Sequence, residues 1–431
     1  MNNQPYNNDS ENEISNNITS ENTEVKTKVP TVEELEEIEY VLPVTHKNQK
    51  KSRKIHNNKT IKTKEEIEKE SSDFVFAQPH KEKKKSKVKK VLLIILIVLL
   101  SLVLILTSTV LIFRHIGKKA MLNYKDMVIK PPSEVENISK IENDGKTVVY
   151  NGKTYVFNEE IATVVMMGID KDDLGITDEI VGTGGQADAI FIGIINNKSD
   201  KVSILSVSRD SMVDVNIYNT KGEFVKTDNM QLCLSFAYGD GKETSTKNTI
   251  NSLERLFYGM KFNTYLALDY KGLHELNDAV GGVTVTATSD FYSYNERRTV
   301  KKGETFTLWG PDSEQYLRTR DLSELESNTD RMDRQKQYIT ALLSNVVPAA
   351  KKDITVVTKL FDAVKDNSTT NLNASKITYL ATEALGNIDS YKNIGFYSVP
   401  GTVLKGEKYA EFHVDQTALW ELMLELFYIE K

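Results

Sequence analysis

The sequence predicts an α/β domain, with helices on both faces of one central sheet, preceded by a single transmembrane helix. Short apolar segments typical of buried strands alternate with segments of helical spacing in the second half of the chain. One run of 23 residues without a charge, Val91–Phe113, is long enough to cross a bilayer. Because no internal repeat interrupts this order, we expect one folded domain on one membrane anchor.

The composition excludes some classes of protein. The 431-residue chain has 39% hydrophobic and 27% charged residues, so it can bury one large core. Its formal net charge of −6 argues against a general nucleic-acid binder. The one cysteine, Cys233, rules out an intrachain disulfide and lies in the apolar run QLCLSFAY. We therefore expect a buried core thiol there rather than a nucleophile.

The N-terminal part of the chain predicts a tail and a signal anchor. Residues 1–90 are poor in apolar residues and end in a run with seven lysines, Lys81–Lys90, so we expect a disordered segment. Residues 91–113 are the expected span, because about twenty apolar residues cross a bilayer core of about 30 Å. Seven lysines in the fifteen residues before the span, against four Lys or Arg in the fifteen after it, favour one orientation. They predict a single-pass protein of the cell membrane with a cytoplasmic N-terminus and an extracellular C-terminal domain.

Residues 114–146 are expected to form a stalk, and residues 147–431 the extracytoplasmic domain. Asn151 and Gly152 lie between two alternating apolar runs and predict a hairpin over residues 148–157. Strands are expected over residues 161–168, 189–195, 202–207, 265–268, 283–287 and 395–399. Helices are expected over residues 244–256, 271–280, 334–343, 354–364 and 374–385.

Charged side chains stand where these strands begin and end. Asp170 closes one strand and Asp188 opens another, and ligands bind at the strand ends of α/β sheets. Two carboxylates suit Mg²⁺, which keeps water and substrate phosphates as its other ligands. Aspartates at strand ends are also common turn formers. Arg209 and Asp210 follow a third strand, where such a pair is also frequent as a surface ion pair.

Four arginines within seventeen residues indicate a polyanionic ligand, because a guanidinium pairs bidentately with phosphate oxygens. An extended backbone would place Arg318 and Arg320 on one face. Arg331, Arg334 and Gln335 share a face at a predicted helix start, whose N-terminus adds a positive end. The alternative is that nearby aspartates neutralise these arginines in a surface network.

Seven motifs across residues 162–343 resemble, in the same order, those of the LytR-CpsA-Psr family of cell-wall glycopolymer ligases. They are GID from Gly168, ADAIFIG from Ala187, SVSRD from Ser206, AYGDG from Ala237, LNDAVGGVTV from Leu276, LRTRD from Leu317 and DRMDRQ from Asp330. The resemblance implies a three-layer αβα domain with a central mixed sheet on a single anchor span. It also implies an active site on the outer face of the membrane.

The same resemblance implies a Mg²⁺-dependent phosphotransferase. Such an enzyme moves a glycopolymer, for example teichoic acid or capsule, from a polyprenyl-pyrophosphate carrier to a hydroxyl of peptidoglycan and releases polyprenyl phosphate. The family's metal aspartates match Asp170 and Asp188. Its pyrophosphate-binding residues match Arg209, Arg318, Arg320, Arg331 and Gln335, with Arg334 as an assisting residue and Asp210 as a candidate general base. Apolar residues of the sheet and of the helices after Arg334 are expected to line a slot for the polyprenyl tail.

The chain departs from the family pattern near these residues. Gln186 stands two residues before the second aspartate, where the family often has an arginine, and Gln231 and Cys233 stand where lysine and asparagine are frequent. The segment between Asp170 and Asp188 is also long. Three other functions remain open. They are a membrane-tethered protein that binds a lipid-pyrophosphate glycan without turning it over, a signalling or regulatory protein whose function lies in the cytoplasmic tail, and a polyprenyl-pyrophosphate pyrophosphatase.

Overall fold

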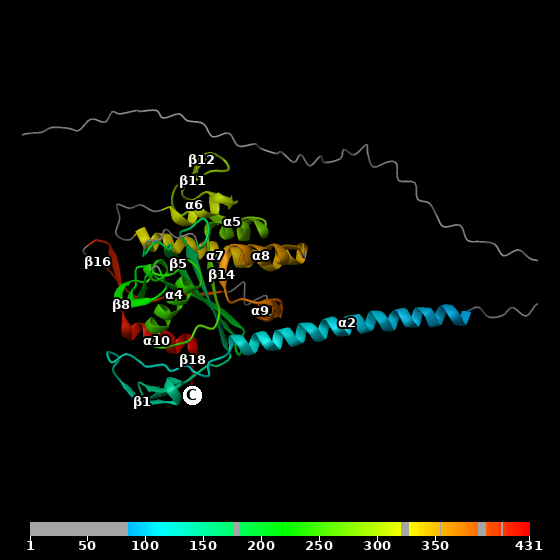
Figure 1. The fold of residues 1–431 in the computed structure, drawn as a ribbon, viewed down its shortest axis with the longest axis horizontal. Coiled ribbons are helices and arrows are strands. Elements are labelled where there is room, and N and C mark those ends of the chain that lie inside the picture. Colours follow the sequence, from blue (N-terminus) through cyan, green and yellow to red (C-terminus); the bar gives the residue numbers. More distant parts are fainter. Residues whose placement is uncertain are drawn as a thin grey trace, which may run out of the picture. The chain divides into compact units, whose positions relative to one another are not determined.

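The structure is a computed structural model of the chain. It describes residues 85–175, 181–219, 221–319, 327–353, 355–386, 394–406 and 408–431. Residues 1–84, which make up most of the expected disordered tail, lie outside the described residues. What is described is a long helix followed by a domain of mixed strands and helices (Figure 1).

A six-stranded mixed sheet forms the centre of the described part of the domain, in the order β14-β9-β4-β5-β6-β15. Its strands are β4 (Ile161–Ile169), β5 (Ala187–Asn196), β6 (Lys201–Val207), β9 (Tyr265–Leu268), β14 (Ser368–Thr370) and β15 (Gly395–Ser398). β5 is antiparallel to both of its neighbours, β4 and β6, whereas β9 is parallel to β4 and β15 is parallel to β6. The end of β4, the start of β5 and the end of β6 therefore meet at one edge, and the five strands expected in this sheet are confirmed.

Helices cover both faces of this sheet, as expected (Figure 1). They are α3 (Leu234–Ala237), α4 (Glu243–Leu256), α5 (Tyr270–Ala279), α6 (Pro311–Arg318), α7 (Ser327–Lys352), α8 (Thr355–Asp366), α9 (Ala374–Gly386) and α10 (Gln416–Phe427). Because side chains alternate along a strand, β4 contributes side chains to the packing on both faces of the sheet. Val165 and Met167 join the main core with residues of α4 and α10, whereas Met166 lines a cavity together with residues of α5 and α7.

A second, antiparallel sheet has the order β1-β2-β3-β18. Its strands are β1 (Ile138–Glu142), β2 (Thr147–Tyr150), β3 (Lys153–Phe157) and β18 (Tyr428–Glu430), with a short 3-10 turn, η2 (Asn143–Gly145), after β1. The predicted hairpin is confirmed, since Asn151 and Gly152 have φ of 50° and 76° between β2 and β3. Both values are left-handed, as a two-residue hairpin turn with this sequence requires.

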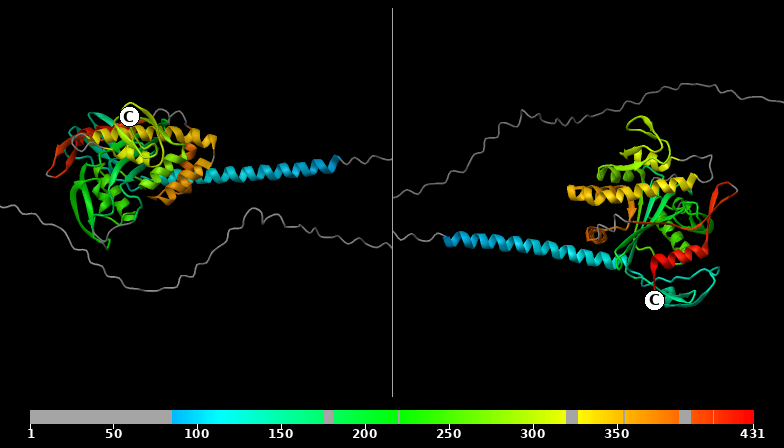
Figure 2. Two further views of the ribbon diagram at one scale, coloured as in Figure 1. Left: turned by 90° about the horizontal axis from the view of Figure 1, so that it is seen from above. Right: turned by 180° about the vertical axis from the view of Figure 1, so that it is seen from behind.

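The helix α2 (Lys85–Met121) runs without a break from the expected span into the domain (Figures 1 and 2). Residues 89–121 are the one helix, within the described ranges, that is long and apolar enough to cross a membrane. The segment expected as a stalk instead packs into the domain, because its apolar side chains Met121, Tyr124, Met127 and Ile129 are buried. The fold therefore begins before residue 147.

The last turns of α2 pack against α9. A Cβ atom on Gly117 would lie 2.1 Å from the backbone oxygen of Ser375, so only glycine permits this close approach. One turn earlier, Arg114 forms an ion pair with Glu383 at 2.5 Å. The buried ring of Tyr379 fills the joint next to α2. This packing ties the candidate membrane helix directly to the domain.

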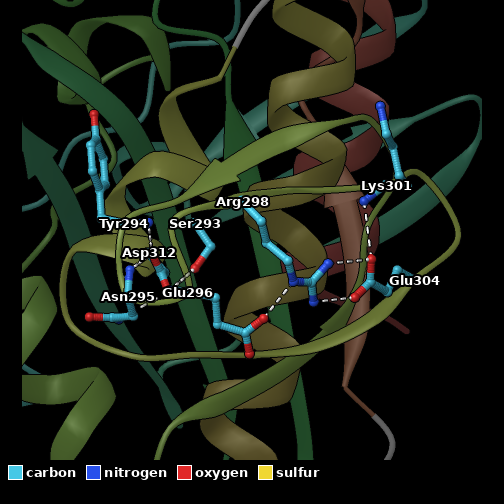
Figure 3. A network of polar contacts seen from close by, with 8 residues as sticks. All are labelled: Ser293, Tyr294, Asn295, Glu296, Arg298, Lys301, Glu304 and Asp312. Atoms are coloured by element: carbon cyan, nitrogen blue, oxygen red, sulfur yellow. Dashed lines mark hydrogen bonds and ion pairs between the residues drawn. The ribbon is translucent and has the colours of Figure 1, made fainter.

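A small lobe stands beside α6. Its strands are β10 (Val283–Thr286), β11 (Phe291–Ser293), β12 (Arg298–Val300) and β13 (Thr305–Leu308). Asp312 in the first turn of α6 is buried and accepts hydrogen bonds from Ser293 Oγ at 2.9 Å, Tyr294 N at 2.7 Å and Asn295 Nδ2 at 2.9 Å (Figure 3). The carboxylate thereby fixes the lobe to the helix that ends at Arg318.

Two further hairpins complete the described elements. They are β7 (Met212–Tyr218) with β8 (Phe224–Gln231), and β16 (Gly401–Lys405) with β17 (Ala410–Val414). An isolated β-bridge pairs Ser211, the residue before β7, with Phe412 of β17.

Candidate active site

Three strand ends bring charged side chains to one edge of the central sheet. Asp170 directly follows β4, Asp188 is the second residue of β5, and Arg209 follows β6 by two residues. Arg209 forms an ion pair with Asp188, and the charges of Asp188 and Arg209 both act on Asp170. The antiparallel pairing of β5 with both neighbours thus assembles residues that are up to 39 positions apart in the sequence.

The guanidinium of Arg209 is held from several sides. Nη1 donates to Asp188 Oδ1, while Nη2 donates to Gln186 Oε1 and to Cys233 Sγ, the latter at 3.1 Å. Nε faces Asp210 Oδ1 at 3.4 Å. The side chain of Arg209 is 16% exposed. Its position is therefore set by the protein, and it orients the Asp188 carboxylate in turn.

The residues that depart from the family pattern are the polar partners in this cluster. Gln186 and Cys233 hold Arg209, and Gln231 Nε2 donates to Asp210 Oδ1 at 3.2 Å. Cys233 is fully buried, which confirms the predicted core thiol. Burial raises the pKa of Cys233 to about 12, so the thiol stays protonated and is no nucleophile at neutral pH.

Asp170 is a half-buried carboxylate. It accepts a hydrogen bond from the backbone N–H of Gln186. Burial raises the pKa of Asp170, and the charge of Asp188 raises it further, against the lowering effect of the Gln186 N–H. Among the described residues, no group of three or more carboxylate, histidine or cysteine side chains could hold a metal. Residues 176–180, between the two aspartates, lie outside the described residues.

The helix α7 contributes two buried polar side chains. Arg331 Nη1 lies 3.6 Å from Asp188 Oδ2, and Arg331 and Gln335, one turn apart, line the same cavity as Asp188. Arg334 is directed elsewhere. Its Nε donates to the carbonyl oxygen of Tyr316 at 3.0 Å, and its Nη2 donates to the carbonyl oxygen of Thr319. Arg334 therefore connects α7 to the end of α6 rather than lining the cavity.

Arg318 is the last residue of α6, so the backbone at this position is helical rather than extended. Its Nη1 pairs with Glu314 Oε1 at 2.6 Å, and its guanidinium lies 4.7 Å from the ring centroid of Tyr270. The side chain is 56% exposed, which leaves this arginine free to turn toward an anion. Arg320 lies outside the described residues.

A cavity of about 180 Å³ lies between the central sheet and α5, α6 and α7. Apolar side chains form most of its wall, among them Met166, Phe191, Leu266, Leu276, Ile339 and Leu342. The polar residues that line the same cavity are Asp188, Asp269, Tyr270, Glu314, Arg318, Arg331 and Gln335. An apolar chamber with a few convergent polar groups suits a ligand with a long apolar part and an anionic part. Its wall includes residues of the sheet and of the helix after Arg334, where the sequence placed an apolar slot.

The fold and the site define a mixed α/β domain that has an arginine-lined apolar cavity and that follows a candidate membrane helix in the sequence. The chain belongs to the LytR_cpsA_psr family, whose model matches residues 127–426. This is the family that the seven sequence motifs resemble.

Known relatives are similar to the chain at low identity. The chain is 26% identical to Biofilm regulatory protein A of Streptococcus mutans over 267 residues, which cover 60% of this chain and 62% of that protein. It is 25% identical to the polyisoprenyl-teichoic acid–peptidoglycan teichoic acid transferase TagU of Bacillus subtilis over 295 residues, 68% of this chain and 83% of that protein. The chain is also similar to the crystal structure of B. subtilis TagV. The match covers 62% of this chain and 96% of the TagV chain, with 22% identity and a TM-score of 0.47.

Proposed function

We propose that the protein is a phosphotransferase that moves a glycopolymer from a polyprenyl-pyrophosphate carrier to a hydroxyl of peptidoglycan. The observation that carries this proposal is the cavity, in which an apolar wall meets Arg318, Arg331 and Gln335 beside Asp188. A polyprenyl chain matches the apolar wall, and a pyrophosphate matches the arginines. The names of relatives that are teichoic acid transferases support a glycopolymer of that class as the donor.

In this reaction, the oxygen of the acceptor hydroxyl attacks the phosphorus next to the sugar. The bond from that phosphorus to the bridging oxygen breaks, and polyprenyl phosphate leaves with the electron pair. Arg318 and Arg331 would neutralise the charge on the phosphate oxygens, which is how proteins accelerate phosphoryl transfer. The proton of the hydroxyl needs a base. Asp210 is less suited to that role than expected, because it contacts Arg209 and Gln231 and does not line the cavity.

We propose Mg²⁺ as the cofactor, held by Asp170 and Asp188. The donor set fits, since Mg²⁺ is commonly bound by one or two carboxylates with water and substrate phosphates completing its shell. A bound cation would also offset the desolvation cost that disfavours the charged form of Asp170. The ion would supply charge neutralisation to the pyrophosphate. Calorimetric titration of Mg²⁺ should show binding that is weakened in Asp170→Asn, and equal binding by both proteins would refute this assignment.

We also propose that the domain lies on the outer face of the cell membrane, with the N-terminus in the cytoplasm. The support is the excess of lysine before the candidate span and the need to reach peptidoglycan. Protease added to intact cells should digest the domain and spare the N-terminal tail. Digestion of the tail with protection of the domain would show the opposite orientation and contradict this proposal.

The proposed activity is tested by glycan transfer with the full-length protein in detergent. The reaction contains a polyprenyl-pyrophosphate saccharide, a peptidoglycan oligosaccharide and Mg²⁺. We expect a covalent saccharide–peptidoglycan product that falls by about 100-fold in Arg318→Ala, the loss typical of one charge-stabilising group. Arg298→Ala is the matched control, because Arg298 is a partly exposed arginine of the lobe that pairs with Glu296 and Glu304.

Each other outcome of this assay identifies a different function. Tight binding of the donor with neither product nor released phosphate would make the protein a tethered binding protein. Release of inorganic phosphate or of glycan phosphate without transfer would make it a pyrophosphatase.

A further inference from the structure

We propose that the hydroxyl group of Tyr270 donates a hydrogen bond to the pyrophosphate of the donor and is an additional anion-binding group of the site. This inference rests on the proposed function. None of the sequence motifs singled out this residue.

Tyr270 is held at the edge of the sheet where the charged residues meet. It is the first residue of α5, directly after Asp269, which caps the helix by accepting a hydrogen bond from Gly272 N at 2.9 Å. Its backbone N–H donates to the carbonyl oxygen of Lys171 at 3.0 Å, next to Asp170. The ring lines the cavity, and the guanidinium of Arg318 lies 4.7 Å from its centroid.

The hydroxyl oxygen of Tyr270 is buried and has no hydrogen-bond partner among the described residues. Other tyrosines that are buried in the domain do have acceptors. Tyr124, Tyr316, Tyr338, Tyr379 and Tyr428 donate to Ile161 O, Gln337 Oε1, Asn277 Oδ1, Asn197 Oδ1 and Gly145 O. A buried polar group without a partner is costly, and a ligand bound beside the Tyr270 ring, which lines the cavity, would complete it.

The protonated phenol has one hydrogen bond to donate, so a ligand that supplies an acceptor would complete it. Burial raises the pKa of Tyr270, so the hydroxyl keeps its proton. Phosphate oxygens are strong acceptors, and hydrogen bonds to charged groups are stronger than those between neutral groups. Arg318, with its exposed side chain above the ring, would bring such an oxygen to the hydroxyl.

The test compares Tyr270→Phe with the unaltered full-length protein in detergent. Binding of geranylgeranyl pyrophosphate and of inorganic pyrophosphate is measured by calorimetry, and Tm is measured without ligand. Phenylalanine keeps the ring under Arg318 and removes only the hydroxyl. We expect about tenfold weaker binding of both probes, the loss of one hydrogen bond to a charged group, and a Tm that is not lowered.

Tyr379→Phe is the matched control, because the hydroxyl of Tyr379 already donates to Asn197 at 2.8 Å away from the cavity. It should lower Tm and leave both affinities unchanged. Equal affinities for Tyr270→Phe and the unaltered protein would overturn the inference. A loss with the lipid probe alone would also overturn it, because the contact would then not be to pyrophosphate. If the unaltered protein binds neither probe, the proposed function fails and the inference fails with it.

Discussion

At the scale of single residues, Arg209 shows why contacts in the site could not be predicted from the chain. Its position after a strand correctly placed it near Asp188, and it was assigned to the pyrophosphate. Its bonds to Gln186 and Cys233 depend on segments 23 and 24 residues away. These two residues depart from the family pattern in the sequence, and in the structure both accept hydrogen bonds from Arg209.

Lys376 gives a pH-dependent prediction at the same scale. The side chain is buried, and burial lowers its pKa from 10.5 to about 8. Below pH 8 the folded protein carries the full cost of burying the charge. Between pH 8 and 10.5 the unfolded chain binds more protons than the folded one, so stability should rise as the pH increases. Thermal unfolding of the full-length protein between pH 7.5 and 9.5 measures this rise.

Lys376→Met should remove that pH dependence and raise stability at pH 7.5 by up to about 3 kcal/mol. The acceptor of Lys376, the carbonyl oxygen of Asn263, would keep a second donor, Asn371 Nδ2, at 3.0 Å. Lys365→Met, at an exposed lysine, serves as the control and should change little. A stability that falls with pH in the unaltered protein, or a less stable Lys376→Met, would contradict the assignment to burial.

At the scale of elements, the regular part of the α/β pattern was predicted well and the polar hairpins were not. The strands of the central sheet are continuous apolar runs, and runs of this kind can be recognised in a sequence. By contrast, most residues of β8 and all residues of β16 are exposed, so their sequences lack an apolar pattern. The helix α7 is much longer than the predicted residues 334–343 and includes Pro348. The helix α10 was not predicted, although the sequence holds a helix-start signal at Asp415. The side chain of Asp415 caps α10 by accepting a hydrogen bond from Ala418 N at 2.9 Å.

The carboxylate of Asp312 should be needed to hold the lobe on α6. In Asp312→Asn, the amide would point donor hydrogens at the donors that now bond the carboxylate (Figure 3). We expect about 2–3 kcal/mol lower stability and faster amide exchange over residues 291–300. Asp290→Asn is the control, because Asp290 is an exposed aspartate of the same lobe, and it should stay within about 0.5 kcal/mol. Unchanged exchange in Asp312→Asn would show that the lobe is held by other contacts.

The joint between α2 and α9 should tolerate no side chain at Gly117. The Cβ atom of Gly117→Ala would meet the Ser375 backbone, so either α2 or α9 must shift. We expect a loss of about 1–3 kcal/mol and faster exchange in α9. Gly386→Ala, whose Cβ would have open space, is the matched control and should be neutral or slightly stabilising. Equal exchange in both variants would mean that α2 is not tied to the domain through this glycine.

At the scale of the whole molecule, the candidate membrane helix and the domain form a continuous unit. Because α2 enters the domain without a stalk and packs on α9, the domain is held close to the point where the helix would leave the membrane. A lipid carrier in the same membrane would then need to move only a short way to reach the cavity. The sequence predicted a long apolar helix here but not its packing, since the contacts join residues more than 250 positions apart.

The most direct test of the central claim is the chemical form of both products of the transfer reaction. Mass spectrometry and phosphorus NMR of the products formed by the full-length protein would locate the bond that breaks. Attack at phosphorus predicts that the released lipid is polyprenyl monophosphate and that a phosphodiester links the saccharide to peptidoglycan. Release of polyprenyl pyrophosphate, with a product that contains no phosphorus at the new linkage, would show glycosyl transfer instead and contradict the proposed role of the arginines.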